Sequence, residues 1–403
     1  MNEPMYNQNQ VPYQGYPPYQ GQPVYQGQPM YQGQPVYQGQ PVYQGQPVYQ
    51  GQNGNYYGND PMQNERMQEQ LRLQHENYLR WMELKQKKKE VGRLSRVLLY
   101  YSMAMFLPAL IYEFIYVFYL AIKYHDNQAL YENEVNQFIS EVVRNGWIYL
   151  IGIALGLMVL LIYRRGKLFK EDIGGIRKPM KVSVFFLLTL LLFVPQTLAS
   201  LFSFGSEVFL NLFGLTADAG VLDIFSSDGM SISMLLYIII FGPIMEEILF
   251  RGVLLHKLEK YGRVFAISIS AICFGIFHGN LSQGLFAIAV GFLLGYVALE
   301  YSVKWCIVLH IMNNAISMGI DMLMNHYTEV PVEFISFIGF AVISVFGIVV
   351  LLIKKNKLIA YVEEHKTVPG SKALVYGNPW FIVFLSLYFV IFVFYLVGSI
   401  SVL

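Results

Sequence analysis

The sequence predicts an all-α membrane protein: a polytopic bundle of about nine transmembrane helices, preceded by a disordered N-terminal repeat tail. Three observations lead to this prediction. Of the 403 residues, 55% are hydrophobic and only 14% are charged, a balance that is unusual for a soluble enzyme. Nine apolar runs have roughly the length that crosses a bilayer. Much of the first 64 residues consists of a repeated hexapeptide, and each unit contains a proline.

Charge and cysteine content argue against several other classes of protein. The net charge is +1 and no Lys- and Arg-rich array or zinc-finger spacing is present, so we expect no nucleic-acid partner. Cys273 and Cys306 lie in apolar runs and form neither a disulfide framework nor a metal-binding motif. The N-terminus lacks the features of a signal peptide, so we expect the first membrane helix to direct insertion.

Residues 1–64 are predicted to form the disordered tail. The hexapeptide Tyr-Gln-Gly-Gln-Pro-Val repeats almost unbroken between Tyr19 and Gln52. Proline in each unit is incompatible with a helix, and aliphatic residues are too sparse for a core. This composition is typical both of a solvated spacer and of a tail that binds a partner, and it does not distinguish between them.

Residues 65–96 are predicted to form a charged juxtamembrane helix, because apolar side chains recur there at helical spacing and proline is absent. Six basic residues stand directly before the first apolar run: Lys85, Lys87, Lys88, Lys89, Arg93 and Arg96. Such a cluster is typical of a cytoplasmic flank that contacts anionic lipid.

The rest of the chain is predicted to cross the membrane nine times. The apolar runs lie near 97–122, 147–163, 182–204, 232–254, 264–279, 283–299, 303–323, 333–353 and 379–402. We divide this part into N-terminal transmembrane helices (97–180), a core (181–353), and a cytoplasmic loop with the last transmembrane helix (354–403).

Basic residues in short loops predict the orientation of these helices. Loop 164–181 contains seven Lys and Arg residues and loop 254–263 contains three, whereas loop 205–231 contains four Asp and Glu residues and no Lys or Arg. Because basic loops stay in the cytoplasm, we expect an integral protein of the cell membrane with a cytoplasmic N-terminus and an external C-terminus.

Polar residues within the predicted spans mark a candidate site, since a charge in the bilayer core costs about 2.5 kcal/mol or more. In the fourth run, Glu246 and Glu247 are adjacent and Arg251 follows one turn later. Spacing of four residues favours pairing of Glu247 with Arg251, whereas Glu246 projects about 100° away and is free for other work.

Two further runs contribute imidazole and carboxamide groups. His278 closes the fifth run, and His310 and Asn314 share one face of the seventh. Together with Glu246 they could activate water and stabilise an oxyanion. At about 1.5 Å per residue, the run boundaries put Glu246 and His310 roughly 10–12 Å deep but His278 about 21 Å deep. Convergence therefore requires tilted helices or a fifth helix that begins lower.

These residues resemble three motifs of the CAAX-protease and bacteriocin-processing (Abi) family of intramembrane proteases. The motifs are Glu246-Glu247-x-x-x-Arg251, Phe274-x-x-x-His278 and His310-x-x-x-Asn314. The resemblance covers about residues 180–350, so 181–353 is expected to be the protease core, and the repeat tail lies outside it.

The resemblance implies an intramembrane endopeptidase that acts on a membrane-associated peptide or protein within the bilayer. It implies that Glu246 and His278 activate water, that His310 and Asn314 stabilise the oxyanion, and that Glu247 and Arg251 orient the site. We favour this metal-free glutamate mechanism and expect no cofactor. The alternative is a metallo-endopeptidase whose Zn²⁺ is held by Glu246, His278 and His310. Against zinc, no His-Glu-x-x-His motif is present, and Asn314 is a poor zinc ligand.

A non-proteolytic immunity or scaffold protein of the same fold is the alternative function. A transporter is less favoured because neither an inverted repeat nor a pair of broken helices is evident. The sequence predicts neither the substrate, including whether it is prenylated, nor the oligomeric state.

Overall fold

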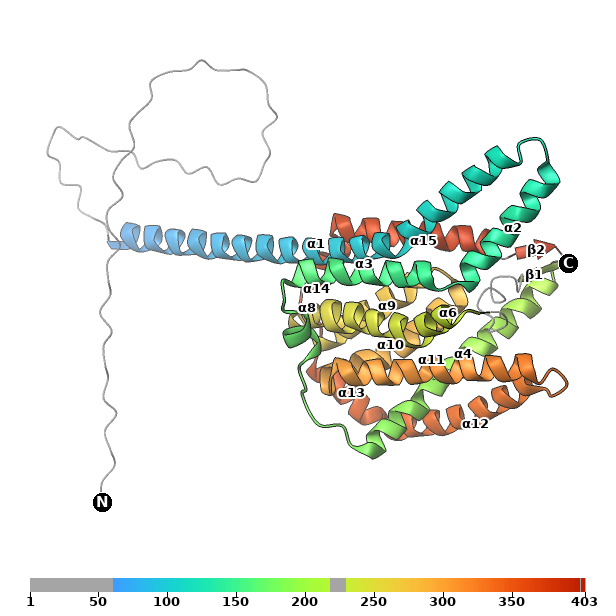
Figure 1. The fold of residues 1–403 in the computed structure, drawn as a ribbon. Coiled ribbons are helices and arrows are strands. Elements are labelled where there is room, and N and C mark those ends of the chain that lie inside the picture. Colours follow the sequence, from blue (N-terminus) through green and yellow to red (C-terminus); the bar gives the residue numbers. More distant parts are fainter. Residues whose placement is uncertain (1–60, 218–229, 399, 403) are drawn as a thin grey trace, which may run out of the picture. The chain divides into compact units, whose positions relative to one another are not determined.

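The computed structural model describes residues 61–217, 230–398 and 400–402, which are almost entirely helical (Figure 1). The first part contains α1 (Pro61–Lys123), α2 (Gln128–Arg144), α3 (Trp147–Arg164), the π-helical segment η1 (Leu168–Ile173), α4 (Val182–Asn211) and the strand β1 (Leu215–Ala217). The predicted repeat tail lies outside the described residues, except for residues 61–64, which belong to α1.

The fourth span is built from consecutive helical segments: α6 (Ile232–Leu236), η2 (Tyr237–Phe241), α7 (Gly242–Glu247), η3 (Ile248–Leu255), α8 (His256–Leu258) and η4 (Glu259–Tyr261). After it come α9 (Arg263–Phe277), α10 (Leu281–Glu300), α11 (Val303–His326), α12 (Val332–Ile353), α13 (Lys355–Glu364), α14 (Ser371–Tyr376), α15 (Pro379–Gly398) and the strand β2 (Ile400–Val402).

The predicted class, an all-α bundle of membrane helices, is confirmed. Within the described residues, eight helices are long and apolar enough to cross a membrane, and they correspond to eight of the nine predicted runs. The other run, 264–279, forms α9, an apolar helix of 15 residues. One addition to the all-α prediction is a short antiparallel ribbon, in which Leu215 of β1 pairs with Val402 of β2.

One predicted division of the chain is not visible as a break. The juxtamembrane segment 65–96 and the first apolar run form one continuous helix, α1. The connection after it contains the amphipathic helix α2, whose start is capped because the Asn127 side chain accepts a hydrogen bond from the Leu130 amide at 3.1 Å.

Small residues bring α9 and α10 close together. A Cβ atom on Gly275 of α9 would lie 2.5 Å from the carbonyl oxygen of Gly284 in α10, so only glycine fits at this crossing. On another side of the core, the Thr197 hydroxyl of α4 lies 2.7 Å from the Ser344 hydroxyl of α12. The buried core centres on η3, α9, α10 and α11, where Phe250, Phe274, Leu294 and Leu309 are at most 1% exposed.

The turn after the fourth span brings the candidate residues to one level. The helix does not end at the predicted run boundary, residue 254, but continues to Tyr261. Gly262 then makes the turn with φ of 110°, a conformation that favours glycine. Glu246 lies 16 residues before Gly262 and His278 lies 16 residues after it. Both are therefore at similar distances from the turn of one helical hairpin, which removes most of the predicted difference in depth.

Several basic loop residues meet acidic partners at one end of the bundle. Arg177 donates two hydrogen bonds to the Glu259 carboxylate, at 2.7 and 2.6 Å, and these bonds raise the pKa of Arg177. Arg263 donates to Glu300 at 3.0 Å, and Lys178 pairs with the same carboxylate. The basic loops 164–181 and 254–263 therefore lie at the same end of the structure, as their predicted orientation requires.

Candidate active site

The fourth span departs from α-helical geometry just before the paired carboxylates. The Gly242 amide donates to the Tyr237 carbonyl in the wider π-helical pattern. In that pattern the Ile238 carbonyl would accept from residue 243, but Pro243 has no N–H group. Asn314 of α11 supplies the missing donor, since its Nδ2 lies 2.9 Å from the Ile238 oxygen.

Glu247 is the buried centre of the candidate site. Its Oε1 accepts a hydrogen bond from Arg251 Nη1 at 2.8 Å, as the spacing of four residues predicted. The same oxygen accepts from His310 Nδ1 at 2.9 Å, across from α11. Glu247 and Arg251 are both 0% exposed. Glu247 therefore holds a cation on its own helix and an imidazole on a neighbouring one.

Glu246 faces the other edge of the same imidazole. Its Oε2 lies 3.7 Å from His310 Nε2, and its side chain is 18% exposed whereas that of His310 is 6% exposed. Each ring nitrogen of His310 thus faces one carboxylate. Of the two carboxylates, Glu246 is the one that solvent or a substrate can reach.

His278 is fixed at the end of α9 by the turn that follows it. Gly279 has φ of 72°, and the Asn280 side chain caps α10 by accepting from the Gln283 amide at 2.8 Å. His278 Nδ1 lies 2.8 Å from the Phe274 carbonyl, which can only accept, so this nitrogen carries the proton and Nε2 is free. His278 lies in the electrostatic range of Glu246, although no hydrogen bond joins the two among the described residues.

The Phe274 ring forms the common wall of the site. Its centroid lies 5.0 Å from that of His278 and 5.7 Å from that of His310, with the rings nearly perpendicular. The Arg251 guanidinium stacks on the ring at 4.2 Å. Gly291 of α10 leaves room for this arginine, because a Cβ there would lie 3.3 Å from Arg251 Nη2. One aromatic side chain thus contacts the three basic groups of the site.

All three predicted motifs therefore meet in one place, but two details differ from the simplest expectation. His310 contacts both carboxylates rather than only the oxyanion position. Asn314 donates one amide hydrogen to the Ile238 carbonyl and accepts from the Asn313 amide at 3.3 Å, so it also joins α11 to the fourth span.

The predicted alternative zinc ligands are Glu246, His278 and His310. Across the described ranges 61–217, 230–398 and 400–402, no three His, Cys, Asp or Glu side chains are grouped closely enough to hold a metal ion. His310 already has carboxylate neighbours at both nitrogens. The three side chains, as they are arranged here, do not fit a zinc site.

Two tyrosines near Glu246 were not among the predicted site residues. Tyr101 of α1 is 1% exposed, and both it and Tyr237 lie within the electrostatic range of Glu246. The Tyr237 ring stacks on Tyr149 with centroids 5.1 Å apart. The sequence offers no signal for either residue, because tyrosine is common in the apolar runs and most of it fills the core or faces lipid.

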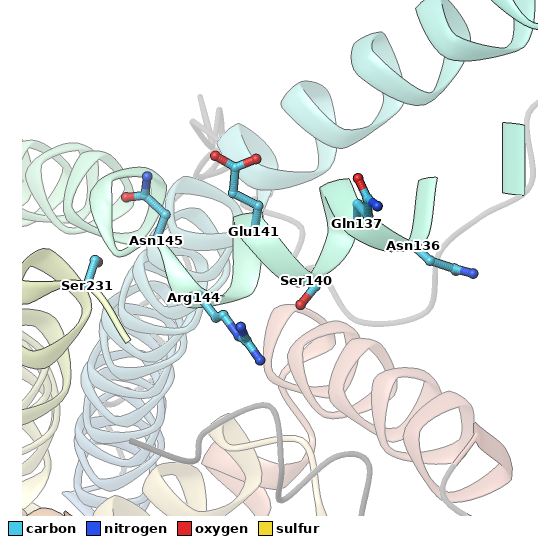
Figure 2. A pocket seen from close by; sticks show the side chains of 7 residues that line it. All are labelled: Asn136, Gln137, Ser140, Glu141, Arg144, Asn145 and Ser231. Atoms are coloured by element: carbon cyan, nitrogen blue, oxygen red, sulfur yellow. The ribbon is translucent and has the colours of Figure 1, made fainter. Parts of the chain in front are cut away.

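An apolar cavity of about 370 Å³ lies between the α9–α10 turn and α15. Ile276, Gly279, Leu285 and Tyr388 are among its lining residues. A wider cavity of about 610 Å³ contains none of the motif residues. It is lined by residues of α2 and its C-terminal end and by the residue before α6: Asn136, Gln137, Ser140, Glu141, Arg144, Asn145 and Ser231 (Figure 2).

Comparison with known proteins supports the resemblance found in the motifs. The family model described as "Type II CAAX prenyl endopeptidase Rce1-like" matches residues 228–316, a range that contains all six predicted site residues. The chain is also 33% identical over 104 residues to the "Putative membrane peptidase YdiL" of Bacillus subtilis (strain 168). That match covers 25% of this chain and 43% of the relative, so the chain spans less than half of the relative's length. No solved structure matches the chain at comparable significance.

Proposed function

Because residues 228–316 match the Rce1-like family model and carry the three motifs that resemble the CAAX-protease family, we propose that this chain is a CAAX-protease-like membrane peptidase. It would hydrolyse a peptide bond of a membrane-associated peptide or protein. The apolar helices support a site within the bilayer. The observation that carries the proposal is the buried imidazole of His310, which lies between the carboxylates of Glu246 and Glu247.

Glu246 is the proposed general base. It is the more exposed carboxylate of the pair, and it accepts no hydrogen bond from the described residues. A water molecule can therefore donate a hydrogen bond to one of its oxygens. His278 offers its unprotonated Nε2 to the same water. Glu246 would take one proton from the water as the oxygen attacks the carbonyl carbon, and would later give that proton to the leaving amine.

His310 is the proposed donor to the oxyanion. As an imidazolium it would have one N–H group for Glu247 and one for the oxyanion. Its Nδ1–H is held by Glu247, which leaves its Nε2–H to donate to the negative charge that develops on the carbonyl oxygen.

Asn314, Glu247 and Arg251 are proposed to complete the site. The Asn314 amide has two hydrogens, and only one is used by the Ile238 carbonyl, so the second remains for the oxyanion. Glu247 and Arg251 would fix the orientation of His310. No step of this mechanism uses a metal, because the candidate ligands are not arranged to hold one.

The orientation of the helices in the membrane is also proposed. The clustering of basic loops at one end supports a single cytoplasmic face that includes the end of loop 164–181. The N-terminus would lie on this face.

The test compares Glu246→Gln with wild type in cells that express the full chain. We expect new peptide termini in the membrane fraction of wild-type cells, found by mass spectrometry, and their loss in Glu246→Gln. Glu113→Gln is the matched control, because Glu113 is a half-buried carboxylate in α1 outside the site. If Glu246→Gln gave the same termini as wild type, Glu246 would not be the base. If wild type gave no new termini, a non-proteolytic immunity or scaffold role would be favoured.

A further inference from the structure

A second polar cavity, of about 250 Å³, lies where three basic segments of the chain meet. Its charged and polar lining comes from α1 (Glu90 and Arg93), the end of α3 (Tyr163 and Arg164), and the end of the fourth span (Lys257, Lys260 and Tyr261). These segments are far apart in the sequence, and each lies at the predicted cytoplasmic end of a membrane helix. The cavity contains none of the residues proposed for proteolysis.

The charges that line the cavity are only partly neutralised. Arg164 is buried and donates to Asp172 at 2.8 Å and to Glu171 at 3.1 Å, and Lys260 pairs with Glu90. Arg93 and Lys257, by contrast, form no ion pair with any described residue. Two cations are thus left without an acidic partner beside one cavity, and Lys257 is partly buried.

A buried donor also remains without a partner there. Tyr261 is 4% exposed, and its hydroxyl oxygen can accept a hydrogen bond from the neighbouring Lys260 ammonium. Its hydroxyl hydrogen has no acceptor among the described residues. A buried donor without an acceptor costs free energy, and most such groups in folded proteins are satisfied. The Lys260 ammonium lies 5.2 Å from the Tyr261 ring, so positive charge surrounds this residue as well.

We propose that this cavity binds a phosphate group through Arg93, Lys257 and the Tyr261 hydroxyl. Two cations and a hydroxyl donor match the acceptor oxygens of a phosphate ester, and charge-assisted bonds of this kind are the strong ones. Positive-inside orientation alone requires only exposed cations, and it explains neither the partial burial of Lys257 nor the buried Tyr261 hydroxyl hydrogen that lacks an acceptor. The phosphate could come from an anionic phospholipid headgroup or from free phosphate in solution, and these sources are distinguished experimentally.

The test uses the purified full chain in detergent and native mass spectrometry. Phosphatidylglycerol and phosphatidylcholine with the same acyl chains are titrated separately. We expect phosphatidylglycerol to bind about tenfold more tightly than phosphatidylcholine, and Arg93→Gln with Lys257→Gln to lower its affinity about tenfold. Tyr261→Phe, which removes only one oxygen atom, should lower the affinity several-fold while preserving the fold.

The matched control is Lys354→Gln with Lys355→Gln, which removes the same charge from exposed residues at the end of α12 and the start of α13. It should bind phosphatidylglycerol like wild type. Inorganic phosphate at millimolar concentration is added to distinguish the two sources. If it displaces the lipid from wild type but not from the Arg93 and Lys257 variant, free phosphate occupies the cavity. If it displaces no lipid, the occupant is the lipid headgroup. An affinity that is unchanged in the Arg93 and Lys257 variant, or that falls equally in the control, would overturn the proposal.

Discussion

Replacement of Arg251 by methionine tests whether the buried ion pair supports the site. Arg251 and Glu247 are both 0% exposed, and they are joined at 2.8 Å. Arg251→Met would leave the Glu247 carboxylate buried with His310 as its remaining partner. Loss of one partner from a buried pair typically costs about 3–5 kcal/mol, and the stacking of Arg251 on Phe274 is lost as well. We therefore expect the free energy of unfolding to fall by about 3–5 kcal/mol.

A second substitution separates this cost from loss of packing. Glu247→Gln in the Arg251→Met background removes the uncompensated charge but keeps an acceptor for His310 Nδ1. The double variant should recover most of the lost stability, because a neutral pair of similar volume has little desolvation cost. Arg251→Met and the double variant should both be inactive. The first removes the positive charge beside Glu247 and His310, and the second also removes the carboxylate that holds His310.

The measurement is reversible unfolding in mixed micelles of increasing sodium dodecyl sulfate content, followed by tryptophan fluorescence. The two single variants and the double variant form a thermodynamic cycle with wild type. The reasoning would be refuted if Arg251→Met were as stable as wild type. It would also be refuted if the double variant lost the sum of the two single losses, since the two groups would then be independent.

Further predictions concern helix packing, the Asn314 bond, metal and the tail. Gly275→Ala should destabilise the fold by about 1–3 kcal/mol because α9 and α10 must separate, whereas Gly319→Ala, which meets no atom within 4 Å, should not, as thermal unfolding would show. Asn314→Leu should cost about 1–3 kcal/mol in the same measurement, because the Ile238 carbonyl loses its donor. Peptide cleavage by purified protein should survive treatment with a chelator, and a loss that Zn²⁺ restores would contradict the metal-free mechanism. Deletion of residues 1–64 should preserve cleavage of a short peptide, and its loss would make the tail part of the enzyme.

The sequence predicts the elements of the site better than their contacts. Apolar runs identify the membrane helices, and a spacing of four residues predicts the bond between Glu247 and Arg251. The sequence could not show that Glu246 also faces His310, because adjacent residues on a helix project about 100° apart. One imidazole can contact both carboxylates, because its two nitrogens lie on different edges of the ring. Which ring enters the gap depends on the packing of α11, and hydropathy carries no information about that.

Run boundaries failed for a different physical reason. Hydropathy falls after residue 254 because Lys257, Glu259 and Lys260 are charged, but charge ends a lipid-facing stretch and does not end a helix. The backbone hydrogen bonds continue to Tyr261, so the true turn is Gly262. A residue that favours positive φ is therefore a better marker of this hairpin than the end of its apolar run.

Pro243 and Asn314 connect the irregular fourth span to the proposed chemistry. The proline deprives the Ile238 carbonyl of a backbone donor, and the Asn314 amide replaces that donor from α11. Because His310 lies one turn before Asn314, the same bond fixes the level at which the imidazole meets Glu246 and Glu247. The asparagine can thus serve the site by position and, through its second amide hydrogen, by donation. In Asn314→Leu, a loss of kcat that exceeds what the loss of folded protein explains would show that Asn314 donates a hydrogen bond to the oxyanion. Losses of kcat and of folded protein that run in parallel would show that Asn314 acts only by fixing the position of α11.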